Sequence, residues 1–229
     1  LWAEDNGAVG GNFGDVLPSS SAAIQDCIDK LASWRGGRVK LSQLVFNVTT
    51  TIYLKTATTL SGSYGDFKIT GQAEQTGTVL RWGGADDGSY MVRAFGVRTS
   101  GFNKLMLDGN GALTIQGLLL DSNNLPSSAQ NQFEFFAINN CLKAVQWGTT
   151  GIAGGSKQAD GTLFRQFTIR SQIPNSVGFV LNSGNTAQYS SIENGGIEVD
   201  DIAVDIVVAN QVQLKKVVSG GPCKTAFCR

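Results

Sequence analysis

The sequence predicts an all-β solenoid that begins with a single α-helix, and three observations support this fold class. Glycine contributes 29 of the 229 residues, well above the usual share of about 7%, and the glycines recur between short apolar and β-branched runs. The segments Gly117–Asn124 and Gly178–Asn185 each end a short apolar run in an Asn- and Ser-containing corner, and they start 61 positions apart. Such a recurrence is typical of stacked coils. Only one stretch, near residues 20–34, has the periodicity of a helix.

The predicted helix follows an irregular lead-in, residues 1–18, that is rich in Gly, Asn and Asp. Three serines at positions 19–21 offer hydroxyls that cap a helix N-terminus, and Gly36 and Gly37 end the helix. Its apolar stripe at i, i+3, i+4 and i+7 consists of Ile24, Cys27, Ile28 and Leu31. We predict that residues 1–36 form a lead-in and a helix that covers the first coil. Residues 37–229 then form the solenoid, in one continuous domain with that cap.

After Gly37 the pattern changes to short apolar runs with no helical segment between them, which does not support alternating strand–helix units. At roughly 22 residues per coil we expect about eight coils, and a rod about 40 Å long at the usual strand spacing. No helix follows the last run, so we expect Pro222–Arg229, a partner subunit or further residues to cover that end. The expected runs are Val39–Leu41, Leu44–Val48, Thr58–Leu60, Phe67–Thr70, Thr78–Trp82, Tyr90–Val92, Lys104–Leu107, Leu113–Leu120, Phe133–Ile138, Leu163–Ile169, Gly178–Leu181, Ile197–Val199, Ile202–Val208 and Val212–Val218.

The composition excludes several classes of function. The 18 basic and 18 acidic residues balance, so the chain lacks the positive charge typical of nucleic-acid-binding proteins. No apolar run approaches the roughly 18 residues of a membrane span, and we expect neither a nucleic-acid partner nor membrane insertion. Histidine is absent, which excludes His-based triads and imidazole metal sites. Of the four cysteines, Cys27 is expected to be buried, whereas Cys223 and Cys228 are candidates for a small disulfide-closed loop.

Several short motifs near the N-terminus occur in a recognisable order. Over residues 5–82 their succession resembles the N-terminal module of the pectate-lyase-like right-handed parallel β-helix superfamily, whose members include phage tailspikes and polysaccharide-cleaving enzymes. The resemblance implies that the solenoid is a right-handed parallel β-helix. The motifs are Asp5-Asn6-Gly7-Ala8-Val9-Gly10, a helix that begins Ser21-Ala22-Ala23-Ile24-Gln25, the run Gly36-Gly37-Arg38-Val39-Lys40-Leu41, Phe46-Asn47-Val48, and Ile69-Thr70-Gly71 followed by Thr78-Val79-Leu80.

The chain departs from this family pattern at two points. Leu17-Pro18 stands about where the family has Asp-Asp, and Ser42-Gln43-Leu44 replaces a Pro-x-Gly turn. Both motifs are structural in the family, so their loss concerns loops rather than activity. Enzymes and non-enzymes share the module, so the resemblance implies a fold and not a reaction.

Carboxylates are the candidate catalytic groups, because glycoside hydrolysis uses two of them, about 5–5.5 Å apart for retention or 6.5–9.5 Å for inversion. Stacked coils about 4.8 Å apart allow either separation. The candidates are Asp121, Glu198 and Asp201. Asp121 also suits an Asx corner, and the pair Asp200-Asp201 also suits a solvated turn. This pair is a candidate Ca²⁺ site as well, but no motif supports it, and we expect no cofactor.

Basic and aromatic residues supply the other candidate roles. A lyase needs a base, together with a cation that neutralises a uronate carboxylate, and Arg165, Arg170, Lys215 and Lys216 are strand-placed candidates for the cation. Trp82 and Trp147 are the candidate carbohydrate-binding residues because their rings can stack on sugars, as can those of Phe133, Phe135 and Phe136. In a solenoid such aromatic residues more often fill the interior or a subunit interface.

Three functional hypotheses follow. The first is a virion-associated tailspike- or fibre-like protein that binds, and when catalytic degrades, host-surface polysaccharide as a homotrimer or with other virion proteins. The second is a secreted polysaccharide lyase or glycoside hydrolase, and the third is a non-catalytic spacer or docking module. Whether the chain is an enzyme stays open at this stage. The expected location is the virion or the extracellular space.

Overall fold

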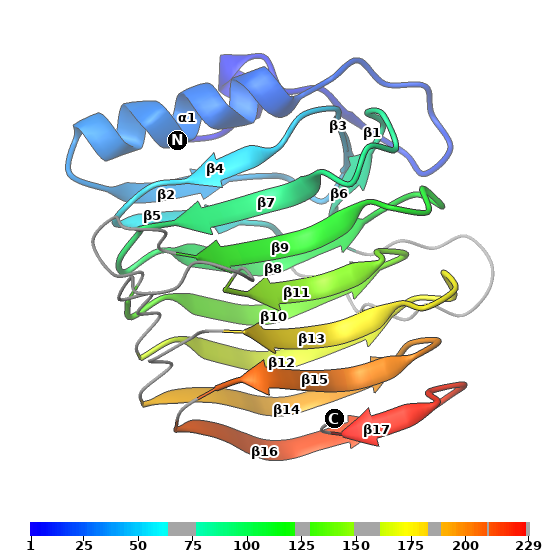
Figure 1. Ribbon diagram of the computed structural model, residues 1–229. Helices are drawn as coiled ribbons and strands as arrows, with labels where there is room; N and C mark the ends of the chain where they lie inside the picture. The colour runs from blue at the N-terminus through cyan, green and yellow to red at the C-terminus, as the bar shows by residue number, and fades with distance from the viewer. Residues whose placement is uncertain (64–76, 122–128, 149–160, 183–188, 210, 228–229) are drawn as a thin grey trace.

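The computed structural model describes residues 1–63, 77–121, 129–148, 161–182, 189–209 and 211–227 of the chain. Parallel strands stack in successive coils beneath one N-terminal helix, and the C-terminus lies in the last coil (Figure 1). The predicted fold class, an all-β parallel β-helix with a capping helix, is confirmed. The predicted run Phe67–Thr70 and the motif Ile69-Thr70-Gly71 lie outside the described residues.

The strands form two sheets, and along the chain each coil visits both of them. Every pairing within the coils is parallel; the exception is the antiparallel pair of β1 and β3, in which the lead-in joins the sheet. Sheet A contains β1 (Gly10–Gly11), β2 (Gly37–Lys40), β3 (Val45–Val48), β5 (Thr58–Ser61), β6 (Thr78–Trp82), β8 (Gly101–Asp108), β10 (Gln132–Asn139), β12 (Leu163–Arg170), β14 (Ser190–Glu198) and β16 (Val212–Ser219). Sheet B contains β4 (Ile52–Leu54), β7 (Tyr90–Phe95), β9 (Gln116–Asp121), β11 (Lys143–Trp147), β13 (Val177–Asn182), β15 (Ile202–Val208) and β17 (Thr225–Phe227).

The coils differ in length more than the sequence suggested. Paired positions lie 21 residues apart between β2 and β5 and 22 apart between β14 and β16, close to the expected repeat. The offset is 42 residues from β5 to β8, 31 from β8 to β10, 31 from β10 to β12 and 28 from β12 to β14. Sheet B therefore has seven strands in the described chain rather than one for each of about eight coils.

A column of left-handed residues bends each long strand of sheet A. The register aligns its members on successive strands, and the first half of β8 pairs with β5 whereas its second half pairs with β6. Intrinsic preference predicts Asn or Gly at such corners, because other side chains cost about 1–2 kcal/mol in this conformation. Only one member of the column is an Asn. The column consists of Lys104, Phe135, Gln166, Asn194 and Lys216, with φ between 51° and 56°.

Aromatic rings from successive coils fill the solenoid interior. Phe164 lies at the centre of this aromatic stack, with its ring centroid 4.9 Å from that of Phe133, 5.4 Å from those of Trp147 and Phe179, and 6.4 Å from that of Phe136. These five side chains are at most 2% exposed. Stacked and edge-to-face pairs of this kind add to the stabilisation that comes from burying apolar area.

Helix α1 (Ser21–Ser33) covers the first coil, and its apolar stripe faces the interior as predicted (Figure 1). Ser20 is the N-cap residue, but its hydroxyl serves the lead-in instead: it accepts from the Val9 N–H and donates to the Val9 carbonyl. The helix ends where expected, because Gly36 has φ +116° and a Cβ there would lie 2.4 Å from the carbonyl oxygen of Ala57. Lead-in and helix therefore act together as the cap.

The last coil lies at the opposite end of the solenoid. Within the described part of the chain, β16 pairs only with β14 and β17 only with β15. Val218 on β16 is 67% exposed, and Val207 on β15 of the preceding coil is 51% exposed. Cys27 is buried, as predicted, and burial raises the pKa of its thiol. Cys228 lies outside the described residues, so its pairing with Cys223 stays a prediction.

Candidate functional site

The three candidate catalytic carboxylates do not form one site. Asp121 ends β9, whereas Asp201 precedes β15, three strands further along sheet B and at the opposite end of the strands. Three strand spacings alone amount to about 14 Å, which exceeds the separation of carboxylates in glycosidases. Glu198 lies on sheet A and forms an ion pair with Arg170, with 3.0 Å between Nε and Oε2. Asp121 is also only 3% exposed.

The two candidate sugar-stacking tryptophans lie inside the solenoid. Trp82 is 3% exposed and donates from Nε1 to the Ala85 carbonyl at 2.9 Å, and Trp147 is 1% exposed within the aromatic stack. Neither ring presents a face on which a sugar can stack. Phe133 and Phe136 belong to the interior as well. The interpretation of these four residues as interior packing holds. Phe133 and Phe136 can both face inward, although they are three positions apart, because the left-handed bend at Phe135 shifts the strand alternation.

Most of the strand-placed cations take part in ion pairs between adjacent coils. Arg165 contacts Glu134 at 2.6 Å and Lys215 contacts Glu193 at 3.2 Å, so that sheet A carries a charge ladder of four residues in register: Glu134, Arg165, Glu193 and Lys215. Arg170 is paired with Glu198. These three cations therefore hold neighbouring coils together and already have carboxylate partners.

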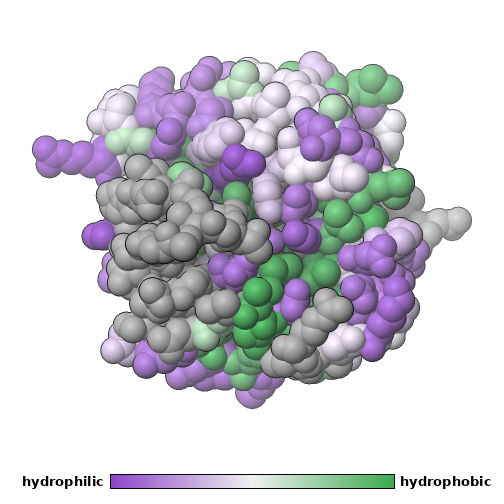
Figure 2. All heavy atoms as spheres, in the orientation of Figure 1, coloured by the Kyte–Doolittle hydropathy of each residue, from purple (hydrophilic) through white to green (hydrophobic). Residues whose placement is uncertain are grey.

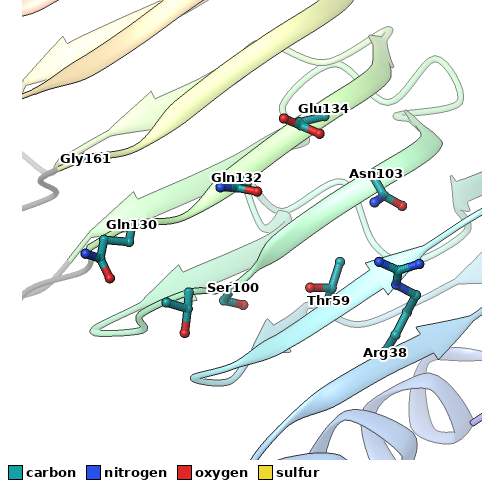
Figure 3. Close-up of a pocket in the computed structure, with 9 residues that line it drawn as sticks. Arg38, Thr59, Ser100, Asn103, Gln130, Gln132, Glu134 and Gly161 are labelled. Atoms are coloured by element: carbon teal, nitrogen blue, oxygen red, sulfur yellow. The ribbon is translucent and has the colours of Figure 1, made fainter.

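A polar groove on sheet A is a candidate site among the described residues. It has a volume of about 510 Å³, within the range of small-ligand sites, and it spans β2, β5, β8 and β10 (Figure 3). Its lining is hydrophilic throughout, in contrast to the outer side of sheet B, where Val177, Val180 and Ile202 form an apolar cluster and Figure 2 shows green atoms. The groove residues are Arg38, Thr59, Thr99, Ser100, Asn103, Gln130, Gln132, Glu134 and Gly161.

Strand register explains why these residues meet. One column of paired positions runs from Arg38 through Thr59 and Gly101 to Gln132, and a second runs from Asn103 to Glu134. Gly101 contributes no side chain between Thr59 and Gln132, so β8 and β10 approach each other closely at that position. No larger residue fits, because a Cβ on Gly101 would lie 1.8 Å from the Gln132 carbonyl oxygen, and its φ is +154°.

The rim of the groove is a second column of left-handed residues. Thr99, Gln130 and Gly161 occupy equivalent positions two residues before their paired strand residues, with φ of 51°, 56° and 59°. Beneath the rim the fully buried Asn131 joins two coils: its Oδ1 accepts from the Ser100 N–H at 3.0 Å, and its Nδ2 donates to the Val97 carbonyl at 3.2 Å. This hydrogen bonding fixes the backbone that carries the rim.

The groove offers hydroxyls, amides, one guanidinium and one carboxylate to a ligand. The Oδ1 of Asn103 is a buried acceptor without a hydrogen-bond partner in the described chain, and such groups are costly unless a ligand or water satisfies them. No local motif in the sequence predicts this site, because its residues come from four strands. The signal in the sequence that could have indicated it is that Arg38, Thr59 and Gln132 each stand beside a residue that is buried in its strand.

Electrostatics in the charge ladder favour the ionised form of Glu193. A hydrogen bond from Ser191 and, next, one from Lys215 lower the pKa of Glu193, and Arg165 adds to the effect. A general acid needs a raised pKa to carry a proton near neutral pH. Glu193 therefore suits charge pairing between coils rather than proton donation.

The acidic pair Asp200-Asp201 has a structural role in the turns that precede sheet B. The carboxylate of Asp200 accepts from the Asn175 N–H at 2.8 Å and from Lys224 Nζ at 2.9 Å, so it connects three successive coils. No three acidic or cysteine side chains among the described residues gather into an arrangement that would hold a metal ion.

We predict that Asp200→Asn lowers the melting temperature at neutral pH and leaves it unchanged in strong acid. Lys224 and then the Asn175 N–H lower the folded-state pKa of Asp200. The stabilisation is therefore present above the ordinary pKa of about 3.9 and is lost as the pH falls through the lower folded value. Thermal melting of both proteins across this pH range measures the effect, and Asp201→Asn is the matched control. A difference that persists below the folded pKa would contradict this assignment.

Solved structures of similar fold cover essentially the whole chain. The A-module of the Azotobacter vinelandii mannuronan C-5 epimerase AlgE6 matches with a TM-score of 0.68 and 19% identity over 99% of this chain and 57% of that one. A Thermotoga maritima exopolygalacturonase matches with a TM-score of 0.63 and 13% identity over 100% of this chain and 65% of that one. A third match is the tailspike gp49 of the Acinetobacter baumannii bacteriophage Fri1, a capsular polysaccharide depolymerase. Its TM-score is 0.58, with 14% identity over 100% of this chain and 48% of that one.

The chain has the fold of a right-handed parallel β-helix. This β-helix spans between about half and two thirds of the length of the three structures. No family model matches its sequence, and no curated protein sequence matches it. Within the described residues, the β-helix has no helix that is both long and apolar enough to cross a membrane.

Proposed function

We propose that this β-helix is a polysaccharide-binding protein and that the sugar chain lies in the polar groove of sheet A. The observation that carries the proposal is the convergence of hydroxyl, amide, guanidinium and carboxylate groups in one hollow of about 510 Å³. Sugars present many hydroxyl groups, and precisely placed polar groups of these kinds fix the orientation of such a ligand. A groove lined by polar side chains suits a hydrophilic polymer better than an apolar small molecule.

The repeat of the solenoid supports a polymeric ligand. Equivalent positions on neighbouring coils recur at about 4.8 Å, a spacing comparable to the length of one sugar residue in an extended polysaccharide. Arg38, Thr59 and Gln132 are such equivalent positions. A chain that follows the solenoid axis therefore meets a polar group from nearly every coil that it crosses.

Binding is tested with a panel of acidic and neutral polysaccharides immobilised for interferometry. Gln132→Ala is expected to lower the affinity for the polymer about tenfold, which corresponds to the loss of one hydrogen bond to a well-oriented polar group. Gln213→Ala is the matched control, because Gln213 occupies the same column on the last coil, outside the groove. Equal effects of the two substitutions, or no binding across the panel, would refute the proposed function.

We further propose a tailspike-like, virion-associated setting in which the protein acts as a homotrimer. The similarity in fold to a phage tailspike and the last coil, which no described element covers, support this proposal. A partner subunit that packs near the last coil would shield Val207 and Val218. Light scattering coupled to size exclusion is expected to give three times the chain mass of 24.2 kDa. A stable monomer would contradict this setting and leave the sugar-binding proposal intact.

Cleavage of the bound chain is the second candidate function, because Glu134 places a carboxylate in the groove beside the guanidinium of Arg165. Such a pair can hold a proton acceptor near a sugar ring. The expected result for Glu134→Gln is loss of any depolymerisation with retained binding, measured by the size of the polysaccharide after incubation. The predicted residues Asp121, Glu198 and Asp201 provide the comparison variants.

A further inference from the structure

Arg38 differs from the other arginines on the described strands of sheet A. Arg81, Arg165 and Arg170 each have a carboxylate partner on an adjacent coil. Arg38 is exposed, lines the groove, and forms no ion pair with any residue that the structure describes. In Figure 3 its side chain extends from β2 toward the part of the groove where Thr59 and Asn103 lie.

We propose that Arg38 makes the groove selective for a polysaccharide with a carboxylate-bearing sugar, which binds at the end of the groove beneath helix α1. The inference rests on the proposed function and names the class of polymer that this site takes. A guanidinium presents its N–H donors in a planar fork that matches both oxygens of a carboxylate. An unpaired guanidinium in a polar groove is suited to that group.

The charge distribution within the groove points to the same class. Glu134 is the acidic residue of the lining, and Arg165 already neutralises it at 2.6 Å. Arg38 therefore remains as the uncompensated charge among the groove residues. Lys40 heads the neighbouring column on β2, where its ammonium group lies 5.4 Å from the centre of the Trp2 ring, and it adds to the positive potential at this end.

The strand register places the two charged groove residues, Arg38 and Glu134, far apart. Arg38 on β2 and Gln132 on β10 are three pairings apart, or about 14 Å at the usual strand spacing, and Glu134 lies two residues beyond Gln132. An acidic sugar near Arg38 therefore avoids the carboxylate of Glu134. The hydroxyl and amide groups between them contact uncharged parts of the polymer.

The experiment compares acidic polymers with their carboxyl-reduced forms, which keep the backbone and lose the charge. Polyuronates and polysialic acid represent the two sources of a carboxylate and are assayed separately. Unmodified protein is expected to bind one acidic polymer at least about tenfold more tightly than its reduced form, the worth of one charge-assisted contact. Arg38→Gln is expected to abolish this preference and to flatten its dependence on salt, and Arg38→Lys to restore part of it.

Arg35→Gln is the matched control, because it removes the same charge from an exposed residue outside the groove. Thermal melting confirms that each variant is folded. A preference for the acidic form that survives Arg38→Gln, or equal binding of acidic and reduced polymers, would overturn the inference. If acidic and reduced polymers bind equally, a loss of affinity on Gln132→Ala would still support the proposed function. The absence of binding to every polymer would refute both the inference and the proposed function.

Discussion

Phe164→Ala is expected to lower the free energy of unfolding by about 3–5 kcal/mol, the usual cost of deleting a buried phenylalanine ring. The ring is completely buried and contacts Phe133, Phe136, Trp147 and Phe179 with centroid distances of 4.9–6.4 Å. Its removal leaves a cavity between two adjacent coils that the stacked strands cannot close. Chemical denaturation followed by circular dichroism measures the loss.

Leu113→Ala is the control for this substitution, because the Leu113 side chain is 60% exposed. Surface truncations of this kind usually change stability by less than about 0.5 kcal/mol. A loss at Phe164 as small as that at Leu113 would show that the interior stack does not hold the coils together. In a solenoid the effect can concentrate in the coils that flank the cavity, so hydrogen exchange locates it.

Gly101→Ala is expected to have the second large effect, on both stability and binding. A Cβ at this position would lie 1.8 Å from the Gln132 carbonyl oxygen, a backbone atom that cannot move without breaking the pairing of β8 and β10. The glycine-favoured φ of +154° costs a side chain about 1–3 kcal/mol, and overpacking adds about 1–3 kcal/mol. Because Gly101 pairs with the groove residue Gln132, a shift of the Gln132 backbone is expected to weaken polysaccharide binding as well.

Gly196→Ala gives the matched control, since nothing lies within 4 Å of a Cβ built there. That variant is expected to be neutral or slightly stabilising, because alanine loses less backbone entropy on folding. Melting temperature and polysaccharide affinity are measured for both variants. If Gly101→Ala matches Gly196→Ala in both measurements, the groove does not depend on the absence of a side chain at position 101.

The sequence by itself determined the fold class and the cap. The stripe of Ile24, Cys27, Ile28 and Leu31 is a local pattern, and the structure buries all four residues beneath α1. Glycine-separated β-branched runs predicted the strands for the same reason, since alternation and corners are encoded within a few residues. The N-terminal motifs added the handedness and parallel pairing of the solenoid, which the similar structures confirm.

Local patterns did not reveal which residues turn the strands. The bend in each long strand of sheet A falls on residues such as Lys104, Phe135 and Gln166, which have no intrinsic preference for positive φ. Pairing with the coils above and below imposes that conformation. The propensity argument that favoured Asn and Gly at corners therefore succeeded at Asn194 and failed elsewhere in the column.

The candidate site was decided by tertiary structure alone. Glu134, Arg165, Glu193 and Lys215 stack in one ladder although they lie 31, 28 and 22 residues apart. Strand order and coil length, rather than spacing in sequence, thus determined that Asp121 and Asp201 lie far apart while Arg38 and Gln132 share a groove. The physical reason is that parallel strands are joined through connections of unequal length. The partners of a residue therefore depend on the length of every coil between them.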